Sequence, residues 1–515
     1  MEKTLSALRA FFWPVYGGEH RKFLPMLLLS FLICFNYYIL RLFKDTIVIT
    51  APESGAETLP FLKVWAILPC ALLLTFIFTR FSNYFGRQKV FYSMMAFFLT
   101  YFLIFILFLY PNRDALHPNE FADSLQSMLP QGFKGCIAML RNWTYTTFYI
   151  MAEMWSTMMM TILFWGFAND VTPLKDARRF YGLFGVGTNF SGVRAGLVVQ
   201  ALSSHVFNSS LPFGANAWDQ SVTFLNLLVI GVGLISTALY WWINRSGLGY
   251  TPESLQAHRE APIKMGIRKN FAFLARSKYL TLIAVLVVTY NIVIALCEIV
   301  WKNEIKMLHS DAASFNAYTG GVIVWVSVLA TTISLFLSGN AMRIFSWTTS
   351  ALIAPIMTLV TGILFFACLL LPQESLAGIC LQFGMTPLAL AVFFGSLQNC
   401  LLRGTKYSLV DATKELAFIP LSQESRSKGK AAIDGVGSRL GKSGGSIFQQ
   451  GLLIAFGSIA ASVPAVAGIL LAALGGWMFV VRLLGKQFNQ LTAEHQVLTV
   501  PDEEKEPSTQ PATSL

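Results

Sequence analysis

Apolar stretches long enough to cross a lipid bilayer as helices recur along almost the whole chain. A spanning helix needs about 20 mostly apolar residues, because the hydrocarbon core is about 30 Å thick. Of the 515 residues, 55% are hydrophobic and 13% are charged, a balance that is unusual for soluble domains. Inside lipid every backbone polar group must be satisfied within a helix or a closed barrel. The chain is therefore predicted to be an all-α polytopic membrane protein.

About twelve spans of this length are predicted. The fourth, fifth and eleventh are interrupted by polar and glycine residues. The spans lie near Phe23 to Leu42, Pro60 to Thr79, Val90 to Tyr110, Leu140 to Ala168, Tyr181 to Val206, Val222 to Ile243, Leu280 to Val300, Tyr318 to Ser338, Thr348 to Leu371, Ile379 to Leu402, Ala431 to Phe456 and Ala460 to Val481.

Basic residues cluster in alternate connections between these spans. The N-terminal arm and the connection from Asn244 to Tyr279 are rich in Lys and Arg, whereas the connection from Phe207 to Trp218 lacks them. By the positive-inside rule, both termini are predicted to be cytoplasmic. The same pattern explains much of the net charge of +11, so attraction to anionic lipid is favoured over nucleic-acid binding.

Metal and redox chemistry have no support in the sequence. The seven cysteines fall within or at the edges of apolar segments without paired spacing, and the six histidines are scattered. No His, Asp and Glu spacing resembles a metal site. No metal and no cofactor are therefore expected.

The long basic connection divides the predicted spans six and six. The stretch "GVGTNFSGVRAG" from Gly185 matches "GVGSRLGKSGGS" from Gly435, 250 residues later, and two weaker echoes follow in the same order. Two homologous six-helix bundles with the substrate between them are the architecture of major facilitator transporters. The predicted parts are an N-terminal arm (1–22), an N-terminal bundle (23–243), a basic cytoplasmic linker (244–279), a C-terminal bundle (280–485) and a disordered cytoplasmic tail (486–515).

The stretch "GVGSRLGKSGGS" resembles a phosphate-binding P-loop but has the wrong spacing. Three residues, not four, separate Gly437 from Gly441, and no apolar strand precedes it. A P-loop needs that spacing to curl its N–H groups around phosphate. Nucleotide hydrolysis is therefore disfavoured, and close packing against another helix or a ligand is the expected use of these glycines.

Charged residues inside the predicted spans point to an anionic substrate. Each costs roughly 2.5 to 3.5 kcal/mol to insert, so such residues usually face a wet cavity or a partner. Basic residues outnumber the two glutamates, which could bind Lys or Arg when the cavity is empty. Snorkelling at helix ends and structural ion pairs are the alternatives. The residues are Arg41, Lys44, Lys63, Arg141, Glu153, Arg194, Glu298, Lys430, Arg439 and Lys442, with Tyr149 among aromatic residues suited to stacking on a base.

Five motifs resemble the ATP/ADP translocases of plastids and obligate intracellular bacteria. They are "YYILRLFKDTIVIT", "IMAEMWSTMMMTILFWGFAND", "CEIVWKNEIK", "RGTKYSLVDATKELAFIPL" and "KGKAAIDGVGSRLGKSGGS", and the resemblance covers about residues 20 to 485. It implies exchange of external ATP for internal ADP with phosphate. The family's essential positions fall on Lys44, Glu153 and Glu298, and on Lys442 or Lys430. A base-selecting Asn is also implied, for which Asn189 is the candidate.

The resulting hypothesis is a monomeric rocker-switch antiporter in a bacterial cytoplasmic (inner) membrane. Arg41 and Lys44 from the first half and Arg439 and Lys442 from the second would hold the phosphates. The expected partners are ATP, ADP, phosphate and the lipid bilayer, and no nucleic acid. A proton-coupled nucleoside triphosphate importer and, less favoured, a membrane ATP hydrolase stay open as alternatives.

Overall fold

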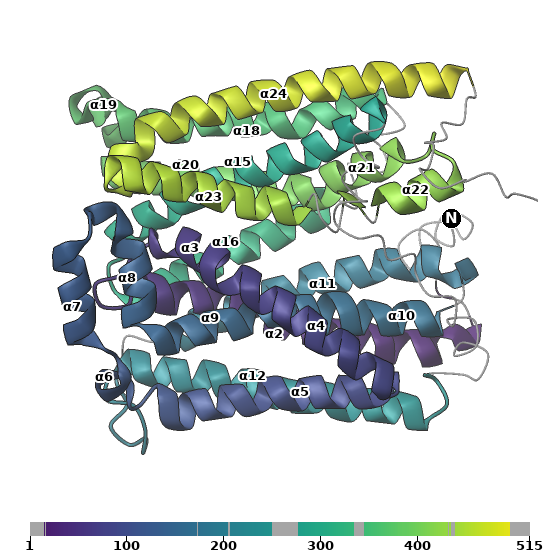
Figure 1. The fold of residues 1–515 in the computed structure, drawn as a ribbon, viewed down its shortest axis with the longest axis horizontal. Coiled ribbons are helices and arrows are strands. Elements are labelled where there is room, and N and C mark those ends of the chain that lie inside the picture. The colour runs from purple at the N-terminus through teal and green to yellow at the C-terminus, as the bar shows by residue number, and fades with distance from the viewer. Residues whose placement is uncertain are drawn as a thin grey trace, which may run out of the picture.

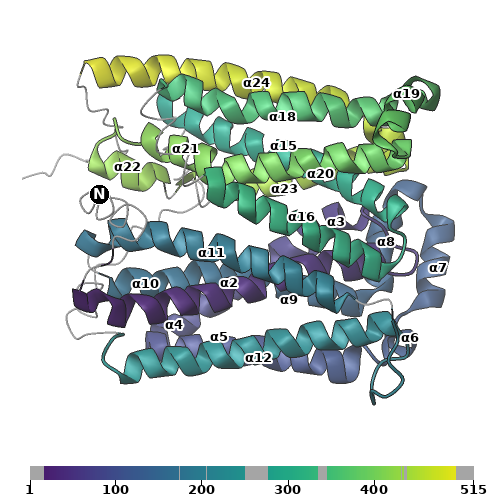
Figure 2. The same cartoon turned by 180° about the vertical axis from the view of Figure 1, so that it is seen from behind.

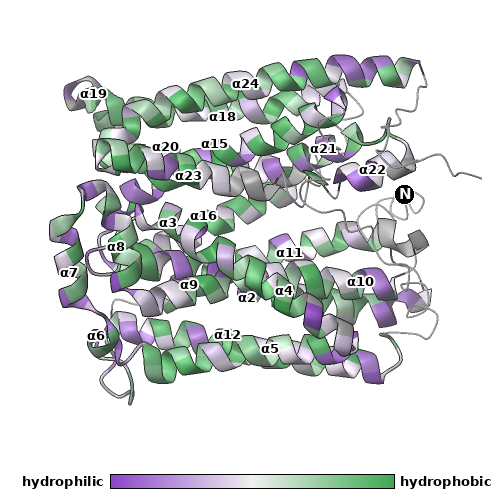
Figure 3. Ribbon diagram, in the orientation of Figure 1, coloured by the Kyte–Doolittle hydropathy of each residue, from purple (hydrophilic) through white to green (hydrophobic). Residues whose placement is uncertain are grey.

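The computed structural model consists of helices that run side by side (Figures 1 and 2). It describes residues 15, 17–172, 174–203, 206–249, 277–333, 345–430, 432–433 and 438–494. Across these ranges it contains no strand, which confirms the all-α class. Hydrophobic residues dominate the middles of the helices, and hydrophilic residues gather toward their ends (Figure 3).

Residues 250–276 lie outside the described ranges. The helices before them form one group, which we call the N-half, and the helices after them form a second group, which we call the C-half. The N-half contains η1 (Gly17–Glu19), α2 (His20–Ile49), α3 (Thr58–Phe61), η2 (Leu62–Ile67), α4 (Leu68–Tyr84), α5 (Arg87–Ile104), η3 (Phe105–Leu109), α6 (Arg113–Leu116), α7 (Asn119–Met128), η4 (Gln131–Phe133), α8 (Lys134–Arg141), α9 (Trp143–Trp155), η5 (Ser156–Phe164), α10 (Trp165–Val171), α11 (Leu174–Leu202) and α12 (Ala217–Arg245). The C-half contains α15 (Lys278–Leu308), α16 (Ala312–Thr332), α18 (Trp347–Leu370), α19 (Gln373–Phe383), α20 (Pro387–Thr405), η7 (Lys406–Val410), α21 (Asp411–Ala417), α22 (Gln423–Lys430), α23 (Ser438–Phe456) and α24 (Ile459–Ala493).

Within the described ranges, each predicted span coincides with a helix or a run of helices. Among the described residues, nine helices are long and apolar enough to cross a membrane, and a bent pair makes a tenth. The two predicted spans that do not meet this criterion are α11 and α23, the helices that carry the glycine-rich repeat. The chain is thus a multi-pass membrane protein whose most polar helices belong to the repeat.

The tenth predicted span begins later than expected. The expected helix from Ile379 is broken into α19 and α20, which are bent by 72°. Gly384 ends α19 in the left-handed conformation, with φ of 61°, and Pro387 begins α20. Glycine tolerates that backbone conformation and proline favours a first turn, so α20 alone forms the straight part of the span.

The predicted linker and tail are described only at their edges. Residues 250–276 and 495–515 lie outside the described ranges. Residues 486–493, expected in the tail, continue α24 as a helix. The bounds of the five predicted parts therefore stay a prediction, apart from this longer last helix.

The glycines of the repeat lie at close helix contacts. A Cβ on Gly196 of α11 would lie 2.6 Å from the carbonyl oxygen of Gly320 on α16. On α23, a Cβ on Gly445 would lie 2.9 Å from the Cβ of Ala295 on α15. Glycine permits such close approach because it has no side chain. The packing interpretation is confirmed for these positions, while Gly435 and Gly437 lie outside the described residues.

Among the described residues, several hydrogen bonds join the two halves at the end of the molecule away from the start of α2. Thr46 donates a hydrogen bond to Asn316 at 2.9 Å, and Asn316 donates one to Ser203 at 2.9 Å. Gln450 donates to the carbonyl oxygen of Pro60 at 2.9 Å. In Figure 1 the ends of α2 and α23 and the start of α16 share this side, opposite the mark of the N-terminus. The halves are therefore joined at that end, which we call the closed end.

Candidate substrate site

Charged side chains from five elements meet between the halves in a group that we call the charge cluster. Burying several charges in a membrane protein is tolerated only when they pair with one another or face a wet cavity. The members are Lys44 and Asp45 on α2, Lys63 on η2, Glu153 on α9, Glu298 and Lys302 on α15, and Arg403 on α20.

Lys302 binds one carboxylate from each half. Its Nζ atom lies 2.8 Å from Asp45 Oδ2 in the N-half and 2.7 Å from Glu298 Oε1 on its own helix. Glu298 precedes Lys302 by four residues, so both side chains lie on one face of α15. Lys302 and Asp45 are both buried, and their ion pair therefore ties the halves together in a low-dielectric region.

Glu298 is surrounded by three cations. Besides Lys302, Arg403 Nη2 lies 2.9 Å from Oε1, and Lys63 Nζ of the N-half lies 3.7 Å from Oε2. Arg403 also donates a hydrogen bond through Nε to Asn399 Oδ1 at 2.8 Å. A second ion pair, between Lys63 and Glu298, thus also joins the halves. Here the cation belongs to the N-half, whereas in the first pair the cation belongs to the C-half.

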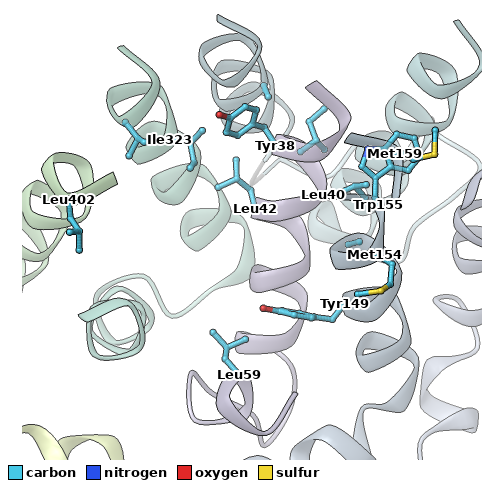
Figure 4. Close-up of a cluster of buried hydrophobic side chains, with 14 of the residues drawn as sticks. Tyr38, Leu40, Leu42, Leu59, Tyr149, Met154, Trp155, Met159, Ile323 and Leu402 are labelled. Atoms are coloured by element: carbon cyan, nitrogen blue, oxygen red, sulfur yellow. The ribbon is translucent and has the colours of Figure 1, made fainter. Parts of the chain in front are cut away.

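Lys44 pairs with Asp45 and with the third carboxylate of the cluster, Glu153. Its Nζ atom lies 3.2 Å from both Asp45 Oδ1 and Glu153 Oε2, and 3.7 Å from the centre of the Tyr149 ring. Glu153 is the most exposed of the three carboxylates, with 39% of its side chain accessible. Figure 4 shows Tyr149 on α9 and, above it, Leu42 of α2, which lines the cluster's cavity with Ile323 of α16.

The cluster has a small excess of positive charge and almost no free space. Four cations against three carboxylates leave a formal charge of +1 (4 − 3), and Arg41 also lines its cavity. The cavity measures about 30 Å³, and one water molecule needs about 10 to 15 Å³ on the same measure, so the cavity holds only a few water molecules. The cations are therefore occupied by carboxylates here, and a larger anion must displace some of these pairs to bind.

The structure brings together six of the residues singled out from the sequence. Those in or around the charge cluster are Arg41, Lys44, Lys63, Tyr149, Glu153 and Glu298. Both glutamates bind basic residues, as the sequence suggested.

The other predicted site residues are not joined to the cluster by any described contact. Asn189 lies partly buried on α11. Lys430 pairs with the exposed Glu415, and its Nζ atom lies 5.5 Å from the centre of the Phe418 ring. Arg439 and Lys442 lie on α23, and their side chains are outside the described part of the structure.

Sequence reasoning missed Asp45, Lys302 and Arg403. A signal existed for each, because all three stand within the motifs quoted above. Asp45 follows Lys44 directly, and Lys302 stands one helical turn after Glu298, a spacing typical of ion pairs on a helix. Arg403 directly follows the tenth predicted span, which ends at Leu402, and a charge at the end of a span often has a partner.

Comparison with known proteins shows the family of this chain. A family model described as the TLC ATP/ADP transporter matches residues 1–488. The chain belongs to this family. Within it, "ADP,ATP carrier protein 1" of Chlamydia pneumoniae is 44% identical over 492 residues, covering 95% of each chain. "ADP,ATP carrier protein 1, chloroplastic" of Arabidopsis thaliana is 39% identical over 479 residues, covering 93% of this chain and 75% of the relative.

Solved structures confirm that this TLC family member has the fold of the major facilitator transporters. The POT family transporter PepTSo has a TM-score of 0.53 at 12% identity, and the match covers 92% of this chain and 98% of PepTSo. An inward-facing bacterial homologue of the lysosomal transporter Spinster has a TM-score of 0.50 at 12% identity, covering 93% of this chain and 98% of the other. At this identity the likeness concerns the fold alone.

Proposed function

We propose that the protein imports ATP in exchange for ADP and phosphate, with the nucleotide bound between the N-half and the C-half. The charge cluster is the observation that carries this proposal, because it draws cations from both halves into one buried place. Phosphate oxygens bind Lys and Arg strongly. The names of the relatives, which are ADP,ATP carriers, support the choice of substrate.

The ion pairs explain how binding would drive the exchange. Lys302–Asp45 and Lys63–Glu298 cross between the halves and must break when the closed end opens. Breaking a buried ion pair costs about 3 to 5 kcal/mol when one charge is left without a partner. Phosphates would offset this cost by binding Lys63, whose described carboxylate partner, Glu298, belongs to the other half. An empty carrier lacks that compensation and would rarely reorient, which makes transport an obligatory exchange.

Pairs within each half keep the carboxylates satisfied during the switch. Asp45 retains Lys44, and Glu298 retains Lys302 and Arg403. The carboxylates therefore act as internal substitutes for phosphate between transport steps. The two bundles would rock as units related by an internal repeat.

The predicted orientation of the two termini determines which side of the membrane the closed end faces. With both termini in the cytoplasm, the closed end faces outward and the substrate site is reached from the cytoplasm. We place the protein as a monomer in a bacterial cytoplasmic membrane. No hydrolytic step is part of this cycle.

Lys442 is the favoured late lysine, with Arg439 as a second phosphate-binding residue. Lys442 follows Gly441, whose Cβ position lies 2.8 Å from the Cβ of Asn291 on α15, the helix that carries Glu298 and Lys302. Lys430 already has an exposed partner in Glu415. We assign Asn189 to the base, because a carboxamide donates to and accepts from the N6 and N7 edge of adenine.

Counter-exchange in proteoliposomes tests the proposed function. Labelled ATP outside should exchange rapidly against internal ADP, and more slowly against GTP, CTP or NAD. Lys44→Gln and Lys442→Gln should lower the exchange rate at least about tenfold, equivalent to 1.4 kcal/mol. Lys430→Gln is the matched control and should stay within about twofold, because an exposed ion pair contributes little.

The alternative functions predict different results in the same preparation. Large net uptake into liposomes without internal nucleotide, driven by a proton gradient, would indicate a proton-coupled importer. Phosphate release by the detergent-purified protein that is lost in Lys442→Ala would indicate a hydrolase. Either result would contradict the proposed exchange.

A further inference from the structure

An uncharged groove of about 390 Å³ lies beside α16, next to the cavity of the charge cluster, with which it shares Val322 as a lining residue. Its volume falls in the range of small-ligand sites. Aromatic and aliphatic side chains dominate its walls, and none of its lining residues is charged. The lining consists of Gln200 from α11, Tyr318, Gly321, Val322, Trp325 and Leu329 from α16, and Phe393, Ser396, Leu397 and Cys400 from α20.

The groove opens on a different face of α16 from the charge cluster. Thr319 and Ile323 line the cluster's cavity, and Gly320 packs against α11. At about 100° per residue, Trp325 points roughly 140° away from Gly320 around the helix. It is 65% exposed, and Phe393 on the opposite wall is 46% exposed. Large apolar side chains on the outer face of spanning helices contact hydrocarbon.

The length of the groove fits part of a lipid acyl chain. From Tyr318 to Leu329 it follows α16 for roughly 16 Å at 1.5 Å per residue. This is about half of the 30 Å hydrocarbon core. The carboxamide of Gln200 lies beside Gly321, the tenth of the 21 residues of α16, and is therefore near the middle of that helix.

The floor of the groove is a glycine with free space around it. A Cβ on Gly321 would meet only the side chain of Gln200, with Nε2 at 2.5 Å. The neighbouring Gly320 instead faces the backbone of α11. Two consecutive glycines thus serve different purposes: one permits helix packing and the other keeps the groove open.

We propose that this groove holds one acyl chain of a membrane phospholipid. The groove is continuous with the interface between the halves, because Gln200 belongs to the N-half and the other lining residues to the C-half. Rocking of α11 against α16 changes its shape. A bound chain therefore stabilises one conformation over the other, as any ligand with unequal affinity does.

A hydrogen-bond chain connects the wall of the groove to the charge cluster. The Tyr318 hydroxyl lies 2.7 Å from Ser396 Oγ, and Trp301 Nε1 donates to the same oxygen at 3.0 Å. Trp301 lines the cavity of the cluster and directly precedes Lys302. The acyl chain thus packs against residues that position an inter-half ion pair.

Photocrosslinking of the full-length protein tests this inference without relying on the proposed transport activity. The protein is placed in nanodiscs containing a phosphatidylcholine with a diazirine in one acyl chain, irradiated and mapped by mass spectrometry. Peptides with Trp325 and Phe393 should carry at least about tenfold more adduct than peptides with Leu471 and Phe479 of α24, the ratio that 1.4 kcal/mol of preference produces. Those two α24 side chains are also exposed.

Filling the groove gives the matched comparison. Gly321→Leu should remove the excess labelling, whereas Gly468→Leu, at an exposed position of α24 with no neighbour within 4 Å, should keep it. Leu397→Trp narrows the opposite wall and replaces Gly321→Leu if that variant fails to fold by size-exclusion chromatography and circular dichroism. Labelling in proportion to side-chain exposure alone would overturn the proposal. Excess labelling of Trp325 and Phe393 that persists in Gly321→Leu or Leu397→Trp would overturn it as well.

Discussion

At the scale of single residues, the ion pair between Asp45 and Lys302 has the clearest testable energy. Both side chains are buried and lie 2.8 Å apart. Asp45→Asn alone and Lys302→Gln alone each leave a buried charge with one partner fewer. Each single variant should therefore lower the free energy of unfolding by about 3 kcal/mol. The double variant should lose less than the sum, with a coupling above about 1 kcal/mol. Thermal unfolding in detergent measures this cycle.

The exposed pair Lys430 and Glu415 is the control for that cycle. Its members are 37% and 47% exposed at their side chains, so its coupling should stay below about 1 kcal/mol. Additive effects of the Asp45 and Lys302 substitutions, within about 0.5 kcal/mol, would show that the pair does not tie the halves.

His117 gives a pH dependence at the closed end. It lies between α6 and α7, with Nε2 2.7 Å from Thr144 Oγ1 and its ring edge-on to Tyr145. Burial lowers the pKa of His117, Arg113 lowers it further, and Asp114 opposes them. The folded protein thus binds this proton more weakly than the unfolded chain, whose pKa is about 6.5.

Stability should therefore be full above pH 6.5 and fall as the pH drops below it. His117→Asn should flatten the dependence of the melting temperature on pH between 7 and 5, while preserving a hydrogen-bonding side chain at this position. An unchanged pH dependence in this variant would show that His117 does not contribute to it.

The candidate site was only partly predictable from single residues. Lys44, Glu153 and Glu298 follow from charges inside apolar spans and from the family motifs. Their partners do not, because Lys302 and Asp45 are 257 residues apart in the sequence. One sequence does not fix the rotation and depth of two such distant helices, and these decide which charges meet.

At the scale of elements, π-helical turns occur beside the charge cluster. Lys63 lies within η2, and η5 and η7 begin three residues after Glu153 and Arg403. A π turn shifts the faces of a helix beyond it and is frequent at functional sites. The apolar pattern predicts the spans well but is insensitive to these one-residue insertions, so they could not be anticipated.

The connection α6–α8 acts as a brace across the closed end. It belongs to the N-half, and Gly132 of η4 approaches α23 so closely that a Cβ would lie 2.5 Å from the carbonyl oxygen of Leu453. Gly132→Leu should push the halves apart and lower the exchange rate at least about tenfold, or 1.4 kcal/mol. Gly378→Leu on α19, with no neighbour within 4 Å, is the control and should exchange normally.

Separation of the halves at the closed end is measurable at Gln450, a buried residue where the halves meet. In a background without the seven native cysteines, Gln450→Cys should react with a membrane-impermeant maleimide several times faster when Gly132→Leu is also present. Equal labelling rates would mean that α6–α8 does not hold the closed end.

At the scale of the whole molecule, the exchange must balance charge across the membrane. ATP carries about one more negative charge than ADP near neutral pH, and moving one charge across 100 mV changes the free energy by about 2.3 kcal/mol. Simple exchange at an inside-negative potential of 100 mV should therefore lower the final internal ratio of ATP to ADP by about 50-fold. Export of one singly charged phosphate with ADP removes this penalty.

Proteoliposomes with a potassium diffusion potential distinguish the two stoichiometries. With internal phosphate, the final ratio of ATP to ADP should be nearly independent of voltage, and phosphate should leave in step with ADP. The same cations of the charge cluster, with their excess of only +1, must neutralise the substrate in each direction of transport. This fits a cycle in which the imported ATP and the exported ADP with phosphate carry similar negative charge. The same voltage dependence with and without phosphate would show that phosphate is not a co-substrate and that the carrier moves net charge in each cycle.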